Sequence, residues 1–137
     1  MIVLDTNVIS EPLSTRPSQK VMDWLDNQVS ETLYISTITY AELRYGVEKL
    51  TDGKRKKELA ERINRVLDLF TDRTLPFDIQ SAEHLARIAA QSAKAGKRAT
   101  APDAYIAAIA ASRGFPVATR NVKHFEHTGV PLINPWD

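Results

Sequence analysis

The stretch Ile2-Val3-Leu4-Asp5-Thr6-Asn7 stands at the start of the chain and decides its fold class. Three consecutive large apolar residues predict a short strand that is buried on both faces, as the strands of parallel sheets are. Asp5 follows this strand directly, and Thr6 and Asn7 begin a segment that resembles the first turn of a helix. A strand that passes straight into a helix indicates an α/β fold.

Further short apolar runs, each bounded by polar or turn residues, predict strands at residues 33–35, 75–77, 117–118 and 132–133. Helical patterns lie between the strands, at residues 18–27, 38–50, 58–70, 82–95 and 103–112. Gly96 and Gly114 stand where left-handed C-terminal caps belong, and Pro102 stands at a helix start. The alternation predicts a short-stranded parallel sheet with right-handed crossovers and helices on both faces.

The composition is that of an ordinary globular protein. The 137 residues are 43% hydrophobic and 26% charged, and we expect a single domain over residues 1–137. No apolar run approaches the ~20 residues that span a bilayer, and no export signal precedes Asp5, so we expect no membrane contact and a cytoplasmic location. The lack of cysteine excludes thiolate metal sites, and a net charge of +1 does not by itself indicate nucleic-acid binding.

Three acids, Asp5, Glu42 and Asp103, stand at the end of a predicted strand or in the first turns of a predicted helix. The carboxyl ends of parallel strands share one edge of the sheet, which is where open α/β sheets bind ligands. We therefore expect the three acids to converge there. Convergent carboxylates repel one another, and oxygen ligands suit hard cations, so the set predicts a site for Mg²⁺ or Mn²⁺.

Each acid also has a purely structural interpretation. Asp5 could serve only as a helix N-cap, and the negative charge of Asp103 is favoured at any helix start. Thr39-x-x-Glu42 matches a capping box, although a cap at Ser36 or Thr37 would instead place Glu42 inside the helix. The metal-site hypothesis therefore depends on the three positions taken together.

Other polar residues near these positions are candidates for supporting roles. Thr6, Asn7 and Thr119 could orient a carboxylate or a water molecule, and each could equally cap a turn. Arg98, Arg120 and Lys123 could bind phosphate, and the basic run 54–57 is interpreted as a solvated helix face. The histidines have no ligand-pair spacing and are not expected to bind metal; they are His84, His124 and His127.

Five segments, taken in order from the first residue to the last, resemble one known family. They are Ile2-Val3-Leu4-Asp5-Thr6-Asn7-Val8-Ile9-Ser10-Glu11-Pro12, Ser36-x-Ile38-Thr39-x-Ala41-Glu42-Leu43-Arg44-x-Gly46-Val47, Asp103-x-x-Ile106-Ala107-Ala108, Ala118-Thr119-Arg120-Asn121 and Asn134-Pro135-Trp136. In these motifs the chain resembles the PIN-domain ribonucleases, and most closely the VapC toxins of the FitB-like branch.

The resemblance implies a three-layer α/β/α fold, RNA cleavage that depends on Mg²⁺ or Mn²⁺, a homodimer, and neutralisation by a VapB- or FitA-like antitoxin. It places Asp5, Glu42 and Asp103 on the acidic positions of the family's metal site. At Asn121 the family commonly has a fourth acid, so this chain departs from the pattern there. Asn121 is then expected to support the site through its amide oxygen or a water molecule.

The expected reaction is hydrolysis of an RNA phosphodiester by water, at an ion held by Asp5 and Asp103. Glu42 would share the ion or orient the water, and Arg98 and Arg120 would hold the RNA backbone. One alternative is a phosphatase with Asp5 as nucleophile, although the position two residues on is Asn7 rather than an acid. The other is an inactive PIN-like scaffold that only binds a partner, which the missing acid at Asn121 keeps open.

Overall fold

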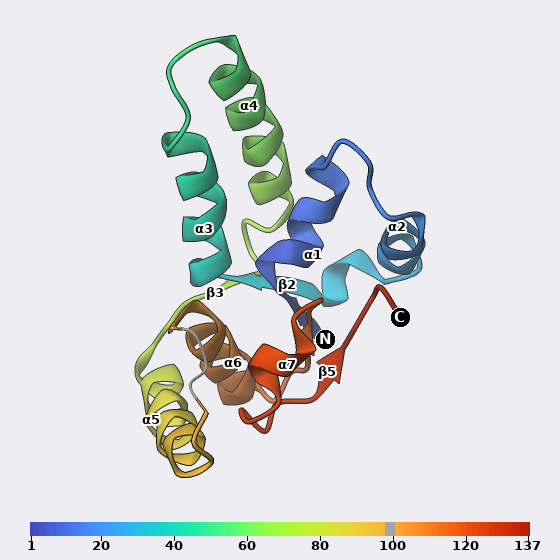
Figure 1. Cartoon of the computed structure of the whole chain (residues 1–137). Helices are drawn as coiled ribbons and strands as arrows, with labels where there is room; N and C mark the ends of the chain where they lie inside the picture. Colours follow the sequence, from blue (N-terminus) through green and yellow to red (C-terminus); the bar gives the residue numbers. More distant parts are fainter. Residues whose placement is uncertain (98–100) are drawn as a thin grey trace.

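Five short parallel strands form one sheet at the centre of the computed structural model, which describes residues 1–97 and 101–137 (Figure 1). Their order across the sheet is β3-β2-β1-β4-β5, and Val3 of the central strand pairs with Tyr34 on one side and Val117 on the other. The strands are β1 (Ile2–Leu4), β2 (Leu33–Ser36), β3 (Thr74–Leu75), β4 (Val117–Ala118) and β5 (Leu132–Ile133). The predicted parallel sheet is confirmed.

The helices lie in two layers, one on each face of the sheet (Figure 1). The first layer, above the sheet in the figure, contains α1 (Thr6–Ser10), α2 (Gln19–Asp26), α3 (Thr37–Glu48) and α4 (Lys54–Leu69). The second contains α5 (Ile79–Lys94), α6 (Ala101–Arg113) and α7 (Val122–Phe125). Two 3₁₀ turns, η1 (Glu11–Leu13) and η2 (Ser30–Thr32), complete the connections. The expected three-layer α/β/α arrangement is therefore present.

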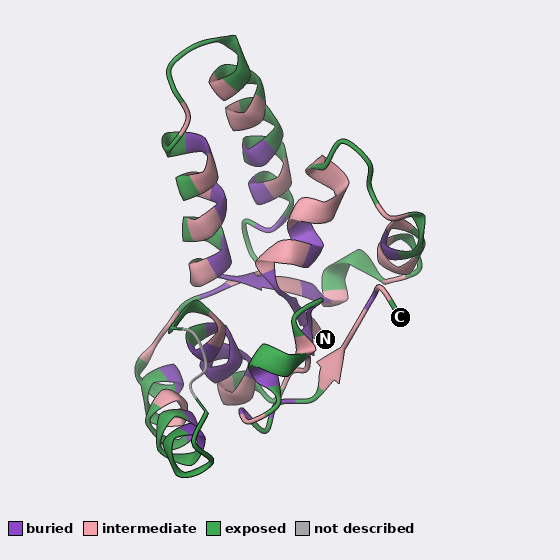
Figure 2. Cartoon of the chain, viewed as in Figure 1, coloured by how far each residue is buried: buried purple, intermediate pink, exposed green. Residues whose placement is uncertain are grey.

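Alternate residues of the central strands supply the two cores. Val3 and Val117 pack with α6 and with Phe125, whereas their neighbours Leu4 and Ala118 pack with α1, α3 and α4. Successive side chains of a strand point to opposite faces, so strands this short can serve both layers only if every residue is apolar. Figure 2 shows the result, with buried residues on the central strands and on the inner faces of the helices, whereas β5 at the edge is half-buried.

Several predicted boundaries differ from the observed ones by a few residues. Strand β3 covers Thr74–Leu75 rather than 75–77, because Pro76 has no N–H to give to a neighbouring strand. Helix α4 begins at Lys54 rather than at residue 58, since the basic run 54–57 consists of good helix formers. Helices α3 and α4 pack as an antiparallel hairpin that projects from the sheet (Figure 1).

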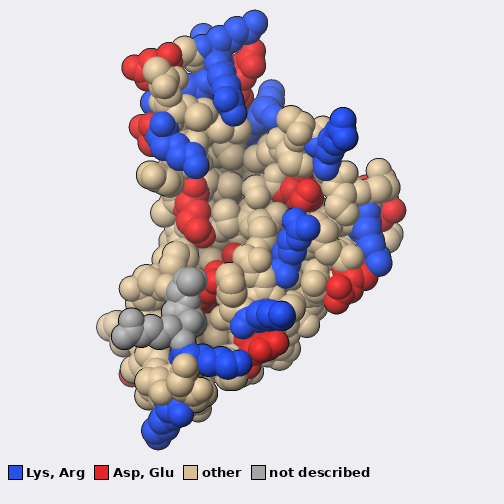
Figure 3. All heavy atoms as spheres, in the orientation of Figure 1, with Lys and Arg blue, Asp and Glu red and all other residues tan. Residues whose placement is uncertain are grey.

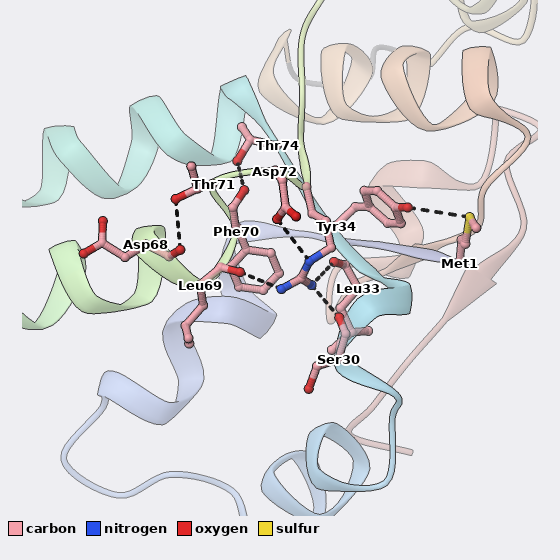
Figure 4. A network of polar contacts seen from close by, with 11 residues as sticks. Met1, Ser30, Leu33, Tyr34, Asp68, Leu69, Phe70, Thr71, Asp72 and Thr74 are labelled. Atoms are coloured by element: carbon pink, nitrogen blue, oxygen red, sulfur yellow. Dashed lines mark hydrogen bonds and ion pairs between the residues drawn. The ribbon is translucent and has the colours of Figure 1, made fainter.

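Arg73 connects the foot of this hairpin to the sheet. Its guanidinium donates hydrogen bonds to the backbone carbonyls of Ser30, Leu33 and Leu69, and it lies 4.9 Å above the ring of Phe70. In Figure 4 the three carbonyl oxygens point toward this shared donor. One side chain thus satisfies carbonyl groups from η2, β2 and the end of α4, which sets the position of the hairpin relative to the strand edge.

The order of the strands locates the crevice of the sheet. The chain builds β1, β2 and β3 outward in one direction, then crosses back through α5 and α6 to place β4 on the other side of β1. In open parallel sheets the carboxyl ends of the strands at such a reversal form a ligand-binding crevice. Here those ends are Asp5 after β1 and Thr119 after β4. No helix in the described part of the chain is long and apolar enough to cross a membrane.

Candidate active site

Asp5 occupies the carboxyl end of the central strand and is almost fully buried, with 3% of its surface exposed. Its Oδ1 accepts a hydrogen bond of 2.7 Å from the backbone N–H of Thr6, so it does cap helix α1. Its Oδ2 accepts hydrogen bonds from Thr119 Oγ1, at 2.7 Å, and from Asn7 Nδ2, at 3.2 Å. An N-cap needs no burial and only one acceptor oxygen, so capping alone does not account for this environment.

The electrostatic environment of Asp5 opposes its negative charge. Burial raises the pKa of the Asp5 carboxyl above its ordinary value, and the charges of Asp103 and Glu42 raise it further. Hydrogen bonds from Thr119 and Thr6 act in the opposite direction and partly offset these effects. Asp103 and Glu42 therefore each lie close enough to Asp5 for their charges to act on its carboxyl group.

Glu42 lies inside helix α3, and the alternative that it forms a capping box is wrong. Ser36 is the N-cap, and its Oγ accepts a hydrogen bond from the backbone N–H of Thr39. Thr6 Oγ1 donates to Glu42 Oε1 at 2.7 Å and lies 3.0 Å from Thr39 Oγ1. Thr6, which follows Asp5 directly, therefore holds the Glu42 carboxylate next to the carboxyl end of β1.

Asp103 lies in the first turn of α6, and only 13% of its side chain is exposed. Its Oδ2 lies 3.1 Å from Nδ1 of His124, a residue of α7. His124 was not expected at the site from the sequence, because α7 is only four residues long and shows no helical period. The only signal in the sequence was its position three residues after Asn121.

The segment after β4 supplies most of the remaining polar contacts. Thr119 is fully buried, and its Oγ1 accepts a hydrogen bond of 3.0 Å from the backbone N–H of Asn121 while donating to Asp5. Asn7 Oδ1 accepts from the backbone N–H of Arg120 at 3.2 Å. The structure thus brings Thr6, Asn7 and Thr119 together around Asp5, each as a hydrogen-bonding neighbour. The side chain of Asn121 is exposed and makes no cap hydrogen bond with α7.

The structure describes two of the three basic residues that were predicted to bind phosphate. Arg120 is exposed beside the site, and its guanidinium lies 5.2 Å above the ring of Trp136. Lys123 is exposed on α7. Arg98 lies outside the described residues. Figure 3 shows acidic atoms at the waist of the molecule below the hairpin, with Lys and Arg atoms on the same face. A polyanion approaching this face would meet both signs of charge.

A divalent cation at this site would depend on more than the protein's own carboxylates. Within residues 1–97 and 101–137, no three His, Asp or Glu side chains are grouped closely enough to hold one ion by themselves. Mg²⁺ in proteins usually keeps several waters and binds through one or two carboxylates together with substrate phosphates. Asp5, whose pKa is raised by burial and by the two neighbouring acids, is a hard oxygen donor whose charge a cation would stabilise. The residues present therefore fit Mg²⁺ or Mn²⁺.

Comparison with known proteins gives consistent matches over the whole chain. A family model described as PIN domain matches residues 2–130. The chain is 46% identical over 138 residues to the VapC ribonuclease Y4jK of Sinorhizobium fredii, covering 100% of this chain and 99% of that protein. It is 47% identical over 137 residues to the Toxin FitB of Neisseria gonorrhoeae, covering 99% of each.

Among solved structures, the crystal structure of FitAcB from Neisseria gonorrhoeae has a TM-score of 0.94 and 47% identity to this chain. The match covers 99% of both chains. The fold of this chain is therefore one already known from that structure.

Proposed function

The chain belongs to the PIN-domain family, and from this premise we propose that it is a metal-dependent ribonuclease and the toxin of a toxin-antitoxin pair. The resemblance expected from the sequence motifs is confirmed at the level of the family. Relatives that align over nearly the whole chain are named ribonucleases and toxins, which supports extending that activity to this protein.

One observation carries the proposal. Asp5 is buried at the carboxyl end of the central strand, at the crevice of the sheet, and its pKa is raised by burial and by the charges of Asp103 and Glu42. A fold that keeps a carboxylate in such surroundings sacrifices stability, and that is typical of functional sites. The arrangement favours binding of a cation, and a bound cation would in turn attract the negatively charged phosphate of a phosphodiester.

In the proposed reaction Asp5 and Asp103 would hold Mg²⁺ or Mn²⁺, and Glu42 would share the ion or orient the attacking water. A divalent ion in such a site supplies Lewis acidity and neutralises charge on the phosphodiester. Thr119 and Asn7 hold the Asp5 carboxylate through its Oδ2, and Thr6 holds Glu42, so the acids are oriented before substrate binds. The positively charged guanidinium of Arg120, on the exposed side of the site, would bind the phosphates of the RNA backbone.

A cleavage assay tests the proposal directly. Purified protein incubated with total RNA should release fragments in Mg²⁺ or Mn²⁺, lose this activity in EDTA, and regain it when metal is restored. Asp5→Asn serves as the control for a contaminating nuclease. Cleavage that persists in EDTA, or that is equal in the variant, would refute the metal-dependent mechanism.

An inactive scaffold is the second candidate, and the exposed Asn121 at the family's fourth acidic position favours it. The two candidates differ in metal binding. Calorimetric titration of Mn²⁺ into the wild-type protein should give a saturable signal for an enzyme and none for a scaffold that has lost its site. The phosphatase alternative gains no support, because both oxygens of Asp5 already accept hydrogen bonds and Asn7 is one of the donors.

We propose a separate antitoxin chain as the partner. The solved structures that match this chain include complexes entitled FitAB bound to a DNA fragment and VapBC bound to DNA. An antitoxin of this VapB- or FitA-like kind would inhibit most directly by placing a guanidinium against the three carboxylates, since Arg pairs with carboxylates through a planar fork. Inhibition should then weaken at high salt or in excess Mn²⁺, and a complex with an open, metal-loaded site would refute this mode.

A homodimer is the proposed assembly. Below the sheet the surface has a hollow of about 320 Å³ lined by Ile38, Phe77, Leu85 and Tyr105. Tyr105 is exposed and the other three residues are half-buried. An apolar surface that solvent reaches in this way can serve as a protein contact. We expect a dimeric mass by light scattering at micromolar concentration, and a shift toward monomer in Tyr105→Glu. We propose that the protein acts in the cytoplasm, because its proposed substrate, RNA, is found there.

A further inference from the structure

Helix α7 places a histidine, His124, beside Asp103 of the acidic site. His124 Nδ1 lies 3.1 Å from Asp103 Oδ2, although the two residues are 21 positions apart and belong to different helices. The side chain of His124 is 53% exposed and that of Asp103 is 13% exposed. One edge of the imidazole therefore faces the carboxylate while a large part of the ring faces solvent.

The chemistry of the pair assigns the direction of this hydrogen bond. A carboxylate has no proton to give, so Nδ1 must carry the hydrogen and donate it to Oδ2. Carboxylates that bind metal ions in proteins are usually hydrogen-bonded by a neighbouring group, which fixes their orientation. The bond restricts rotation of the Asp103 carboxylate about its Cβ–Cγ bond.

The position of His124 is itself fixed by the core. The next residue, Phe125, is fully buried in the core that lies between the sheet and α6. Its carbonyl accepts a hydrogen bond of 2.6 Å from Thr128 Oγ1, and the backbone N–H of His124 donates to Asn121 O at 2.9 Å. A side chain on a helix anchored in this way can hold a partner in one geometry, as preorganised sites require.

We propose that His124 is a positioning residue for Asp103, which orients that carboxylate for the divalent cation. This inference rests on the proposed metal-dependent function and extends it to a residue outside the acidic triad. His124 takes no part as a ligand in this role. Its contribution is to reduce the reorganisation that Asp103 undergoes when the cation binds, so its loss weakens metal affinity and catalysis together.

Four proteins test the proposal: the wild type, His124→Asn, His124→Leu and His84→Leu. Asparagine places its Nδ2 where histidine has Nδ1 and keeps the N–H donor, whereas leucine fills a similar volume without a donor. His84 lies on α5, which carries none of the three acids, and so controls for loss of a histidine elsewhere. Melting in EDTA checks that each protein is folded.

The first measurement is calorimetric titration with Mn²⁺. Loss of a hydrogen-bond partner behind a ligand typically costs about 10- to 100-fold in metal affinity, so we expect a loss of that size in His124→Leu. His124→Asn and His84→Leu should bind close to wild type. Equal affinity in His124→Leu and wild type would overturn the inference, and so would equal losses in the Leu and Asn variants, because the donor at Nδ1 would then be irrelevant.

The second measurement separates positioning from RNA contact. In saturating Mn²⁺, His124→Leu should lower kcat for RNA cleavage and leave KM for RNA unchanged. A raised KM with unchanged kcat would overturn the inference in favour of a substrate contact. If the wild type binds no Mn²⁺, both the inference and the proposed function are wrong. If the wild type binds Mn²⁺ and His124→Leu cleaves RNA as well as the wild type does, the inference alone is wrong.

A third measurement needs no variant, and it decides the matter if His124→Leu does not fold. Nitrogen NMR of the histidine rings in the metal-free protein distinguishes the two neutral tautomers. The inference requires the hydrogen of His124 on Nδ1. A ring with its hydrogen on Nε2 could not donate to Asp103 through Nδ1 and would overturn the inference.

Discussion

Thr119 Oγ1 donates a hydrogen bond of 2.7 Å to Asp5 Oδ2 and joins the ends of two neighbouring strands that are 114 residues apart in sequence. Both residues are buried, and Thr119 also accepts the backbone N–H of Asn121 through the same oxygen. One hydroxyl thus connects the carboxylate at the crevice to the loop that carries Arg120 and α7. The orientation of Asp5 and the course of this loop therefore depend on each other.

Replacing Thr119 with valine keeps the shape and removes both hydrogen bonds. The buried Asp5 carboxylate then loses a partner, which costs about 1–3 kcal/mol. Asn121 is exposed, so its N–H can donate to water instead. We expect Thr119→Val to melt lower and to cleave RNA more slowly, while Thr119→Ser retains most of both properties. Thermal melts and initial cleavage rates measure this, and equal stability of the Val and Ser variants would contradict it.

Asp5→Asn should abolish cleavage without destabilising the metal-free protein. Because burial raises the pKa of Asp5 above 3.8, the folded protein binds this proton more tightly than the unfolded chain. The protonated Asp5 therefore favours folding at low pH, and this contribution is lost as the pH rises through the raised pKa. Asparagine also remains a good N-cap for α1.

Melting curves in EDTA at a series of pH values measure this effect. At pH 7 the Asp5→Asn variant should melt at or above the wild-type temperature, and its advantage should shrink as the pH falls toward 3.8. A lower melting temperature at pH 7, in the absence of metal, would show that the Asp5 charge, or the hydrogen bonds that its two oxygens accept, stabilises the fold.

Asn121→Asp places a carboxylate at the position where the family commonly has a fourth acid. An added hard oxygen donor should tighten binding of Mn²⁺ or Mg²⁺. Four neighbouring acids repel more than three, so the metal-free variant should melt below wild type and gain more on addition of metal. The residue is exposed, so solvent screens the repulsion and the loss should be small. Equal metal affinity and equal stability would place Asn121 outside the site.

Replacing Asp78, the N-cap of α5, tests a contribution to stability that is separate from the acidic site. Its Oδ1 accepts hydrogen bonds of 2.9 Å from the N–H and the hydroxyl of Ser81, and these bonds, with a smaller effect from Arg113, lower the pKa of Asp78. An acid with a lowered pKa stabilises the fold at neutral pH, and that contribution is lost as the pH falls through the lowered value. Asp78→Ala should therefore melt lower at pH 7, by a margin that narrows below pH 3.8, with unchanged RNA cleavage.

Much of the fold follows from local sequence. The apolar residues of β1, the N-cap at Ser18 and the left-handed glycines at 96 and 114 are set by side-chain and backbone preferences within a few residues. The predictions that failed were boundaries, such as the starts of α4 and β3, where competing local preferences are nearly balanced. That Glu42 and Asp103 lie near enough to Asp5 to affect its pKa agrees with the expectation that the carboxyl ends of parallel strands share one edge.

Contacts between distant segments were not predictable from the sequence. From the sequence, Ser36 and Thr39 were equally good N-caps. In the structure Ser36 caps α3, and Glu42 lies inside the helix, where it accepts a hydrogen bond from Thr6. His124 carried no helical period and no ligand spacing, yet burial of Phe125 turns α7 so that its imidazole meets Asp103. The sequence alone indicated which chemical groups stand at the edge of the sheet, because alternating strands and helices predict a parallel sheet whose strands end at one edge. Only the tertiary structure decided which groups touch, because a hydrogen bond depends on a few tenths of an ångström that the packing of whole helices sets.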